Sequence, residues 1–583
     1  MPATKVICRL PGDSDRLMQF DRPTEVLTAY TPEAVIPVLT AAETAARKGC
    51  YVAGFVAYEA ATAFEPACRV HPSGAFPLVW MAVFTAPPHP YAGVARDDSM
   101  TLPRPIPALA FPEYRRAVTT ILDHIAAGDI YQANYTIRTR LATGAVAPEM
   151  VFAELYRRHP VPEAAYIDTG DLRILSLSPE LFLERRGRSL RSVPMKGTAP
   201  RALSAAADRA AAAALAADEK NRAENLMIVD MVRNDLGRVC RPGSIAAEPL
   251  FQVETYRTVH QMIGTVTGDL RSGYGLPEIF AAAFPAASIT GAPKIRAMEI
   301  IRATETSPRR AYTGSIGVMV PGGDCRFNVA IRTLIDDGDG YELGVGGGIV
   351  ADSRPEAEWA EANLKSAFAA APPLPPFQVI ETIFYSRRKG WTMLEEHLLR
   401  AEASQRYFGR TFDRQRLMTY LAELDPSAAY ARVRLALDAD GIPTSTIFPL
   451  PQPGWNKTAI TVGLAEPVRS RRDIFLYHKT TVRELYDQVY RQGLETGCDE
   501  MIWCNEEGEL TEGCIGNLFL RCHGEWLTPA WECGLLPGIW RRRTLVELSA
   551  RETILTREDL LSAETVLVGN SVRGGVTVGR IIG

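Results

Sequence analysis

At 583 residues the chain is too long for a single hydrophobic core, so two or more domains are expected. Its composition, with 46% hydrophobic, 23% charged and 8% aromatic residues, excludes wholesale disorder. The net charge of -4 argues against a nucleic-acid-binding surface.

The N-terminus and the cysteines indicate a cytoplasmic protein. Residues 1–5 lack the apolar stretch of a signal peptide, and no apolar run approaches the roughly 20 residues that span a bilayer. The ten cysteines are scattered, without a CxxC pair or zinc-ligand spacing, which is typical of free thiols in a reducing compartment. We therefore expect neither a membrane nor a nucleic-acid partner.

The first half of the chain predicts a mixed α+β domain. Val118, Ile121, Leu122 and Ile125 have helical spacing and Gly128 follows them, so a helix is expected there. Residues 129–200 read as strands. The alanine-rich stretch 205–217 is expected to lead into a long helix, with residues 219–235 in it, that ends near Gly237, and a last helix covers about 355–370. Strands and helices follow no regular βαβ period.

A proline-rich connector divides the chain. Residues 372–376 read Pro-Pro-Leu-Pro-Pro, a stiff linker between a domain over 1–371 and a second, α/β domain over 377–583. In the second domain we expect a strand at 377–385, a helix near 395–408, strands at 431–437 and 500–503, and a turn at 506–508.

Two lysines in chemically suggestive settings lie on opposite sides of this linker. Lys196 stands in Pro-Met-Lys-Gly-Thr and Lys479 in His-Lys-Thr-Thr. A lysine that is desolvated can lose its proton and act as a nucleophile or form an imine. Two such lysines in separate domains predict two consecutive chemistries on one chain.

Two groups of carboxylates in the first half have helical spacing. Glu224 shares a helix face with apolar residues, and Glu358, Glu361 and Lys365 follow at i, i+3 and i+7. Ion pairs, from Glu224 to Arg222 or Arg233 and from Glu361 to Lys365, are the simplest interpretation. The alternative is a Mg²⁺ site, because Mg²⁺ prefers oxygen ligands and binds through few carboxylates.

Six segments stand in order along the first half: Ser178-Pro179-Glu180, Pro194-Met195-Lys196-Gly197-Thr198, Lys220-Asn221-Arg222-Ala223-Glu224-Asn225, Val232-Arg233-Asn234-Asp235-Leu236-Gly237, Gly291-Ala292-Pro293-Lys294 and Tyr312-Thr313-Gly314-Ser315-Ile316-Gly317. Over about residues 50–370 this set resembles the chorismate-utilising enzymes, which include anthranilate, isochorismate and aminodeoxychorismate synthases. The resemblance implies a chorismate-binding fold. An anthranilate-synthase-like activity is the alternative within the family.

The lysine at position 196 is similar to that of the aminodeoxychorismate synthases, since the other members usually carry alanine there. The resemblance implies that Lys196 adds to C2 of chorismate as the 4-hydroxyl leaves, and that ammonia then attacks C4 and expels the lysine. Such covalent catalysis splits one hard displacement into two easier ones. Glu180 is implied as the general acid and base at the departing hydroxyl.

The same resemblance assigns the remaining residues of the first site. Glu224 and Glu361 are implied as Mg²⁺ ligands, with Glu358 close by. His260 is expected near the ring, although a buried structural histidine is the simpler interpretation. The residues expected at the substrate are Arg332, Tyr312, Gln132, Gly346 and Lys365. Gln132 stands where isochorismate synthases have a water-activating lysine, which favours ammonia as the nucleophile.

The chain lacks an amidotransferase signature, because no cysteine lies in a Gly-x-Cys-x-Gly elbow. We therefore expect ammonia from solution or from a separate glutamine amidotransferase subunit. The N-terminal region is short compared with relatives that bind tryptophan there, so no tryptophan site is predicted.

The second half offers the four parts of a pyridoxal phosphate site. Lys479 can form the Schiff base and Glu512 can pair with the pyridine nitrogen. Residues 536–539, Leu-Pro-Gly-Ile, precede a predicted helix whose N–H groups can hold phosphate, and Arg400 can supply positive charge. Taken singly, Glu512 reads as a turn residue and Arg400 as a helix-surface residue.

The motifs of this half also stand in a distinctive order: Leu394-Glu395-Glu396-His397-Leu398-Leu399-Arg400, Tyr477-His478-Lys479-Thr480-Thr481, residues 505–513, Gly516-Asn517-Leu518-Phe519, Gly534-Leu535-Leu536-Pro537-Gly538 and Gly569-Asn570-Ser571-Val572-Arg573-Gly574. They resemble the class IV pyridoxal-phosphate enzymes over about 377–583, which implies further cofactor contacts at Gly516, Asn517, Ile539 and Trp540. The family usually has threonine where Trp540 stands, so the phosphate cradle is expected to depend more on backbone. Relatives pair subunits, so a homodimer through this domain is expected.

Class IV lyases and aminotransferases share this framework, and the fused first half favours the lyase. The product of an aminodeoxychorismate synthase, 4-amino-4-deoxychorismate, is the lyase substrate, and loss of pyruvate gives 4-aminobenzoate for folate biosynthesis. Thr382 is similar to a threonine that assists proton transfer in the lyases. The alternatives are a synthase with a C-terminal aminotransferase or degraded partner-binding domain, and a non-catalytic scaffold that recruits the amidotransferase.

Overall fold

The computed structural model describes residues 4–12, 16–94, 100, 102–142, 146–336, 338, 340–370 and 373–582, so residues 1–3 and the predicted boundary residues 371 and 372 lie outside the described part. Its contacts divide the chain into two compact units. Unit 1 comprises Met1–Pro200 and Ala212–Leu374, and unit 2 comprises Arg201–Ala211 and Pro375–Gly583. The inclusion of 201–211 in unit 2 differs from the predicted domain limits. No helix in the described ranges is long and apolar enough to span a bilayer.

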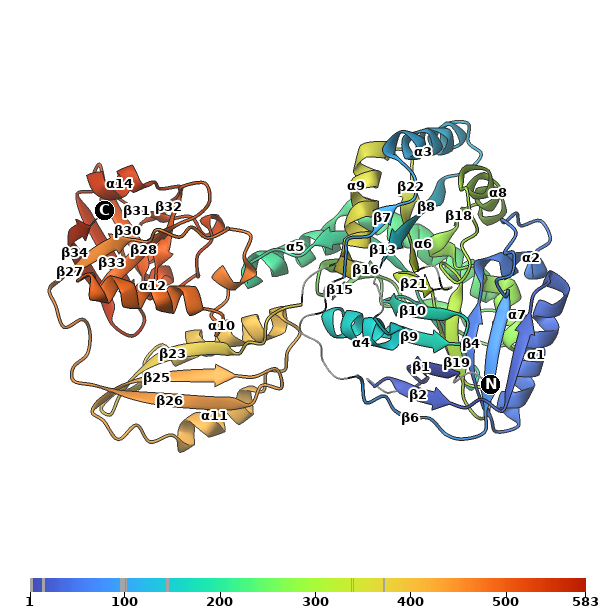
Figure 1. The fold of residues 1–583 in the computed structure, drawn as a ribbon, viewed down its shortest axis with the longest axis horizontal. Helices are drawn as coiled ribbons and strands as arrows, with labels where there is room; N and C mark the ends of the chain where they lie inside the picture. Colours follow the sequence, from blue (N-terminus) through green and yellow to red (C-terminus); the bar gives the residue numbers. More distant parts are fainter. Residues whose placement is uncertain are drawn as a thin grey trace. The chain divides into compact units, whose positions relative to one another are not determined.

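Unit 1 is built on two large antiparallel sheets and a small one (Figure 1). The ten-stranded sheet contains β1 (Lys5–Cys8), β2 (Met18–Asp21), β6 (His89–Pro90), β7 (Ile106–Pro107), β8 (Gln132–Leu141), β9 (Glu163–Asp168), β10 (Arg173–Ser178), β18 (Gly291–Ala292), β21 (Thr333–Asp336) and β22 (Tyr341–Ile349). The nine-stranded sheet contains β3 (Glu25–Ala29), β4 (Tyr51–Val56), β5 (Val79–Phe84), β11 (Leu181–Arg186), β12 (Ser189–Val193), β14 (Ala246–Ala247), β17 (Val266–Asp269), β19 (Ser315–Met319) and β20 (Cys325–Asn328). The small sheet has the order β13 (Met195–Pro200), β16 (Val259–Ile263) and β15 (Gln252–Thr255).

The helices that begin and end in the first half are α1 (Pro32–Arg47), α2 (Ala61–Phe64), α3 (Phe111–Ala126), α4 (Pro148–Arg158), α5 (Ala205–Ala217), α6 (Glu219–Gly237), α7 (Leu276–Ala283), α8 (Lys294–Thr304) and α9 (Pro355–Ser366). One apolar cluster packs α1, α6 and α7 on the nine-stranded sheet, and another packs α3, α4, α8 and α9 on the ten-stranded sheet. A third cluster joins the two sheets face to face. Unit 1 therefore has helices outside and two sheets inside.

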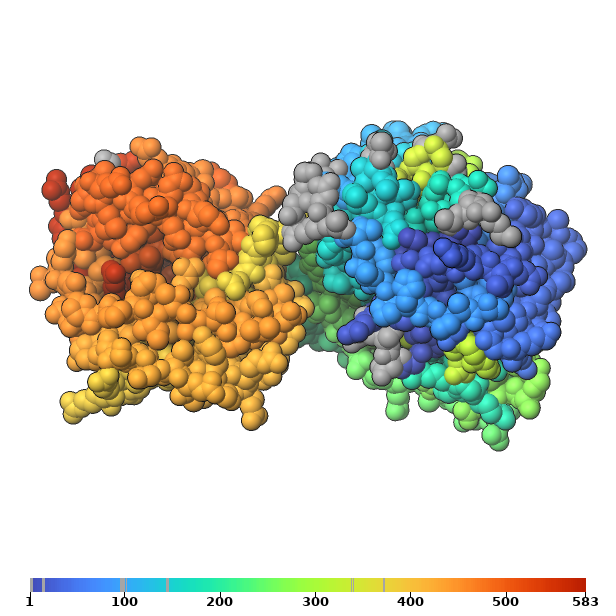
Figure 2. All heavy atoms as spheres, turned by 60° about the horizontal axis from the view of Figure 1, so that its bottom comes forward, coloured from blue at the N-terminus to red at the C-terminus, as the bar shows by residue number. Residues whose placement is uncertain are grey.

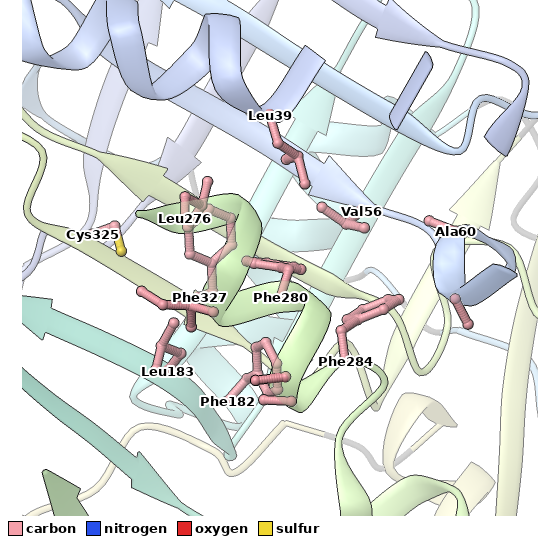
Figure 3. Close-up of a cluster of buried hydrophobic side chains, with 14 of the residues drawn as sticks. Leu39, Val56, Ala60, Phe182, Leu183, Leu276, Phe280, Phe284, Cys325 and Phe327 are labelled. Atoms are coloured by element: carbon pink, nitrogen blue, oxygen red, sulfur yellow. The ribbon is translucent and has the colours of Figure 1, made fainter. Parts of the chain in front are cut away.

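Strand β5 illustrates why its sequence suits an inner layer. Met81 and Val83 face the helices, whereas Trp80 and Phe84 face the second sheet, because successive side chains of a strand point to opposite faces. Both faces are covered, so all six residues of the strand are buried. Figure 3 shows the helix-side core, where Phe280 and Phe284 of α7 and its C-cap meet Phe182 and Phe327 from the sheet.

Residues 375–582, coloured from yellow to red in Figure 2, contain two sheets of different character, whose strands Figure 1 draws as arrows. The four-stranded antiparallel sheet has the order β24 (Gly390–Trp391), β23 (Val379–Ser386), β25 (Tyr430–Leu437) and β26 (Pro443–Leu450). The eight-stranded mixed sheet has the order β29 (Leu510–Gly513), β28 (Glu500–Cys504), β27 (Ala459–Leu464), β34 (Gly574–Ile582), β33 (Thr565–Asn570), β30 (Asn517–Cys522), β31 (Glu525–Pro529) and β32 (Arg551–Thr553). The helices of residues 375–582 are α10 (Leu394–Tyr407), α11 (Arg414–Glu423), α12 (Glu484–Glu495), α13 (Ile539–Glu547) and α14 (Arg557–Ser562).

One expectation from the sequence was wrong, and another was confirmed. Residues 129–200 are not strands throughout, because α4 occupies 148–158 with proline at its first turn, a position that favours helix starts. The long helix expected to end near Gly237 is α6, and the alanine-rich stretch before it forms a separate helix, α5. Asp218 ends α5 and caps α6 by accepting a hydrogen bond from the Asn221 N–H at 2.7 Å.

The packing of α7 predicts a large stability effect. Phe280 is fully buried, so Phe280→Ala should lower the free energy of unfolding of unit 1 by about 3–5 kcal/mol through lost transfer energy and a residual cavity. Ile106→Ala, at a side chain that is 71% exposed, is the control and should change it by less than about 0.5 kcal/mol. Denaturant unfolding measures both, and a loss below about 1 kcal/mol for Phe280→Ala would contradict this packing.

Candidate active sites

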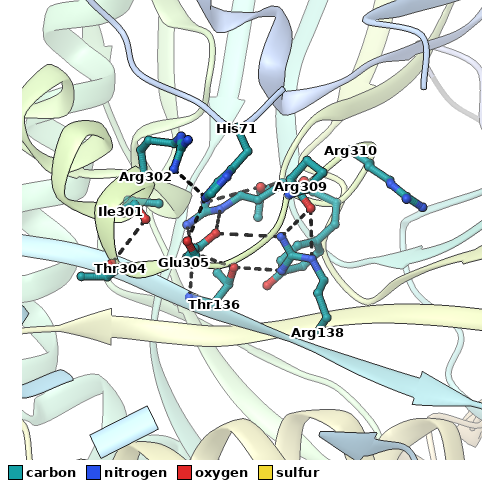
Figure 4. A network of polar contacts seen from close by, with 12 residues as sticks. His71, Thr136, Arg138, Ile301, Arg302, Thr304, Glu305, Arg309 and Arg310 are labelled. Carbon is teal, nitrogen blue, oxygen red and sulfur yellow. Dashed lines mark hydrogen bonds and ion pairs between the residues drawn. The ribbon is translucent and has the colours of Figure 1, made fainter. Parts of the chain in front are cut away.

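A buried ion-pair network fixes the framework of the site in unit 1 (Figure 4). Arg309, 1% exposed, donates to both carboxylate oxygens of Glu305 at 2.6 and 3.0 Å. Glu305 also accepts from the backbone N–H and hydroxyl of Thr136 on β8. The Arg309 guanidinium bonds the carbonyls of Asn134 and Ile289 as well. The start of β8 is thereby held beside the turn that carries Tyr312.

Lys196 lies on β13 with its amine in a confined place. Its Nζ is 3.4 Å from a carboxylate oxygen of Glu224 on α6. A Cβ atom added at Gly348 on β22 would lie 2.5 Å from that Nζ and 3.1 Å from the Gln132 amide nitrogen. A side chain at position 348 would therefore require the lysine amine to move from this place. The ion-pair partner of Glu224 is therefore Lys196; among the described residues, Arg233 pairs with Asp230 instead, and Arg222 lies over the Phe251 ring.

Gln132, the first residue of β8, is completely buried, and neither atom of its amide has a hydrogen-bond partner within the described residues. A buried amide without partners is costly, so such a group commonly awaits a ligand. Its place beside Lys196 makes it a candidate contact for a small polar molecule at this lysine.

The second carboxylate group lies on α9 against the glycine segment of β22. Glu358 accepts from Ser353 at 2.7 Å, and Glu361 pairs with Lys365 at 2.6 Å as the simpler interpretation predicted. Lys365 also donates to the Gly346 carbonyl at 3.0 Å. A Cβ at Gly347 would approach Glu358 to 3.2 Å and Glu361 to 3.8 Å, so the glycine leaves space between strand and carboxylates.

These carboxylates fit Mg²⁺ in donor type. Glu224, Glu358 and Glu361 offer oxygen ligands, which Mg²⁺ prefers. In the part of the chain that the structure describes, no three acidic, histidine or cysteine side chains already converge as a metal site. Glu224 and Glu361 are held by Lys196 and Lys365 instead. A metal ion would compete with two lysines for its ligands.

Glu180 has the properties of a proton donor at neutral pH. The carboxyl is 4% exposed and accepts from the Ser288 hydroxyl at 2.6 Å. Burial raises the pKa of Glu180 to about 7, because a desolvated carboxylate is unfavourable. Lys196 is close enough to Glu180 to act against that rise, so the two groups interact electrostatically.

Arg332, Tyr312 and His260 occupy different settings. Arg332 is in the left-handed region with φ of 49°, and burial lowers the pKa of its guanidinium, for which the described residues provide no ion pair. The Tyr312 ring packs on Gly344 of β22. His260 lies opposite Ala199 of β13, and its Nδ1 is 3.0 Å from the Thr255 hydroxyl. Arg332 is thus the cation best suited to a substrate carboxylate.

The predicted residues of unit 2 line one cavity of about 280 Å³. They are Thr382, Arg400, Lys479, Glu512, Gly516, Asn517, Ile539 and Trp540. Elements that are distant in the sequence, β23, α10, β29, β30 and α13, contribute most of these residues to the same cavity.

Lys479 lines this cavity, and its amine is partly neutral near pH 7. Its backbone carbonyl accepts from the Ile380 N–H at 2.9 Å, which ties it to β23. Burial, with the nearby charges of Arg483 and Arg400, lowers the pKa of Lys479 to about 7. A lysine amine that is deprotonated at neutral pH can form an imine.

Glu512 is held as an acceptor on the same cavity. Its carboxylate accepts from the Tyr486 hydroxyl at 2.9 Å and from the Asn517 amide at 3.2 Å. Burial raises the pKa of Glu512 to about 7. A protonated pyridine nitrogen placed here would favour the ionised carboxylate, as the predicted role requires.

The start of α13 forms a cradle suited to phosphate. Gly538 is the N-cap, and any side chain there would collide with Asn517, which itself donates to the Leu536 carbonyl at 3.1 Å. Free N–H groups at a helix N-terminus favour an anion. Trp540 packs its indole against Phe519 and Gly569, so it forms part of the cavity wall and offers no hydroxyl group to a phosphate.

Arg400 has a closer partner than the sequence indicated. It donates to both oxygens of Glu381 at 2.8 and 2.7 Å, and His397 lies 2.6 Å from the same carboxylate. Burial opposes ionisation of Glu381, but Arg400 and His397 outweigh it and lower the pKa of Glu381 to about 2. Arg400 is therefore oriented by Glu381 at the cavity wall.

Sequence reasoning missed four cavity arginines, Arg432, Arg434, Arg483 and Arg573. The signal for two of them was present: Arg432 and Arg434 alternate with buried Ala431 and Val433 on β25, which places both arginines on one face. Burial lowers the pKa of Arg432, and the nearby charges of Arg573 and Arg434 lower it further. The cavity thus presents excess positive charge to an anionic ligand.

Two protein families match this chain, each over a different half of the sequence. Residues 95–371 match the family of chorismate binding enzymes, and residues 378–581 match amino-transferase class IV. The chain therefore combines a chorismate-binding-enzyme domain with a class IV aminotransferase domain. A class IV domain implies pyridoxal phosphate, and the Lys479 cavity with its helix N-terminus fits that cofactor.

The individual relatives cover only part of the chain. An aminodeoxychorismate synthase from Streptomyces griseus is 42% identical over 47% of this chain and 37% of its own length. Aminodeoxychorismate synthase component 1 from Bacillus subtilis is 40% identical over 44% of this chain and 54% of its own. Anthranilate synthase component I from Streptococcus pneumoniae has a similar fold, with a TM-score of 0.51 at 23% identity, covering 64% of this chain and 91% of that one. The chain thus spans about half or less of the two sequence relatives.

The environment of Lys479 gives a pH-dependent prediction. In the cofactor-free chain, acetylation of Lys479 by trace acetic anhydride should rise with a midpoint near pH 7, because burial disfavours the ammonium form. Exposed Lys389, labelled in the same sample, is the internal reference. Peptide mass spectrometry measures both. A Lys479 midpoint above about 9.5 would contradict the desolvated amine.

Proposed function

We propose that the chain makes 4-aminobenzoate from chorismate and ammonia in two steps. The first domain aminates chorismate at C4 to 4-amino-4-deoxychorismate, and the second removes pyruvate. One observation carries the proposal. Lys196 lies in a chorismate-binding domain whose relatives include aminodeoxychorismate synthases, and this domain is joined to a class IV domain with a desolvated lysine.

In the first step the Lys196 amine attacks ring carbon C2 while the 4-hydroxyl leaves. Glu180, with a pKa of about 7, gives the hydroxyl its proton so that water departs. Ammonia then bonds to C4, the bond from C2 to Lys196 breaks, and Glu180 is available to take up the released proton. Gln132 supports this assignment, because its unpaired amide offers hydrogen bonds to ammonia beside Lys196.

Substrate recognition in the first domain rests on charge. Arg332 is a desolvated cation, which suits a substrate carboxylate bidentately. Glu224, Glu358 and Glu361 would hold Mg²⁺, which would offset the negative charge of the other carboxylate. We propose that a separate glutamine amidotransferase delivers the ammonia.

In the second step pyridoxal phosphate supplies an electron sink for the substrate amine. Lys479 would carry the cofactor, Glu512 would pair with its ring nitrogen, and the start of α13 would hold its phosphate. Because its pKa is about 7, the Lys479 amine can take the ring proton whose loss makes the product aromatic. Thr382 lines the same cavity and is placed to orient that proton transfer.

Two lysine variants separate the two steps. Lys196→Ala should lower formation of the aminated intermediate at least about 10³-fold while the chain still converts supplied 4-amino-4-deoxychorismate. Lys479→Ala should do the reverse and accumulate the intermediate. Chromatography with mass detection follows both, and Lys48→Ala, at an exposed lysine of the first domain, is the control.

Unchanged amination in Lys196→Ala would refute the nucleophile assignment. A requirement for a keto-acid acceptor, with transfer of the amino group in place of pyruvate release, would identify the second domain as an aminotransferase.

The metal assignment is tested separately by titrating the full chain with Mg²⁺ in a calorimeter. Glu224→Gln should weaken binding about tenfold or more, because one charged ligand is lost. Glu219→Gln, exposed on the same helix, should bind as the unaltered chain does. Equal affinity for all three proteins would remove Glu224 from the metal site.

A further inference from the structure

Residues 201–211, here called the strap, belong to unit 2 although they come from the first half of the sequence. The strap begins directly after Pro200, the last residue of β13, which carries Lys196. Within the strap, Asp208 accepts from Arg201 Nε at 2.7 Å and from the Ala202 N–H at 3.0 Å. Arg201 and Asp208 have side chains only 8% exposed, so this turn is a fixed local structure.

The strap is fastened to α10 through Tyr407. Arg201 donates to the Tyr407 carbonyl at 2.9 Å, and its guanidinium carbon lies 4.3 Å from the centre of the Tyr407 ring. The Tyr407 hydroxyl donates back to the Ala202 carbonyl at 2.9 Å. Leu203 packs on the apolar cluster that contains Leu476 and Tyr477. Polar and apolar contacts thus hold the strap at the segment leading to Lys479.

The contact that matters most reaches the neighbour of Lys479. The His478 Nε2 atom is 3.1 Å from the Leu203 carbonyl, and Nδ1 is 3.0 Å from the Ser404 hydroxyl. A carbonyl only accepts, so Nε2 carries the hydrogen. Burial lowers the pKa of His478 to about 4, so the ring is neutral and Nδ1 accepts from Ser404. One tautomer and one ring orientation satisfy both partners.

These bonds leave His478 with little freedom. Its ring is also packed against Tyr407, with centroids 4.3 Å apart, and against Phe408 at 4.8 Å. On the other side of Lys479, the backbone is tied to β23 by the Ile380 N–H. Lys479 therefore lies between two fixed points. Its own backbone is bonded to β23, and the neighbouring His478 is held by the strap.

We propose that the strap is a positioning element of the second active site, which holds His478 and thereby keeps Lys479 desolvated at the cavity. The role of Lys479 as cofactor carrier rests on the proposed function. The consequence is that residues 377–583 do not contain all of their own site, since the acceptor for His478 is supplied by Leu203.

Charge and anchoring are separable by mutation. The charged groups that act on Lys479 are Arg483, Arg400, Glu381 and Glu512, and none of them lies in the strap. Arg201→Ala removes a charge and an anchor, whereas Tyr407→Phe removes only the hydroxyl that holds Ala202. Arg209→Ala, exposed on the same strap, is the matched control.

The test measures acetylation of Lys479 against pH in the cofactor-free full chain, with Lys389 as internal reference. Arg201→Ala should raise the Lys479 midpoint by about one pH unit or more, which is an about tenfold smaller ratio of neutral to protonated amine at pH 7. Tyr407→Phe should shift it in the same direction by less, and Arg209→Ala should not shift it. Binding of added pyridoxal phosphate, followed by absorbance, should weaken in the same order.

Midpoints in Arg201→Ala and Tyr407→Phe that coincide with that of the unaltered chain would overturn the inference. Should Arg201→Ala fail to fold by circular dichroism, Tyr407→Phe, which keeps the ring and all charges, decides alone. If the unaltered chain binds no pyridoxal phosphate at Lys479, the proposed function fails, but the labelling comparison still decides whether the strap holds the lysine.

Discussion

The buried ion pair between Arg309 and Glu305 is the constraint on which the first site depends. A buried charge is tolerated only when it is paired and its remaining hydrogen-bonding groups are satisfied. Here the satisfied groups include Thr136 and the carbonyl of Asn134 on β8 (Figure 4). The pair therefore fixes the strand that begins at Gln132 relative to the turn that carries Tyr312. With the strand fixed, glycine at 347 and 348 leaves the space in which Lys196 and the carboxylates meet.

The two lysines work in different surroundings, and the difference follows their proposed tasks. Lys196 is paired with Glu224, a residue that a metal ion would also engage, so its amine sits among acidic groups that a bound metal and substrate would rearrange. Lys479 lies among arginines and apolar walls, which favour its neutral form before any ligand arrives. One site thus relies on ligands to complete it, whereas the other is largely preorganised.

Motifs in the sequence found many of the residues that converge in unit 2, since all eight predicted residues line one cavity, but they assigned no role to Arg432, Arg434, Arg483 or Arg573. Periodicity also indicated the ends of α10 and β25 closely. The strand prediction failed at α4, where a proline in the first turn favours the start of a helix. Periodicity could not predict the Arg400–Glu381 pair or the contact between the strap and His478. Each joins residues 19 or more positions apart, and no local sequence pattern signals such a contact.

The central claim is that both chemistries proceed in order on this chain. The most direct measurement is incubation of the full chain with chorismate, ammonium, Mg²⁺ and pyridoxal phosphate, followed by identification of the products by mass. The account predicts 4-aminobenzoate and pyruvate in equal amounts, without a keto-acid acceptor. Accumulation of 4-amino-4-deoxychorismate with no pyruvate, or formation of anthranilate, would contradict it.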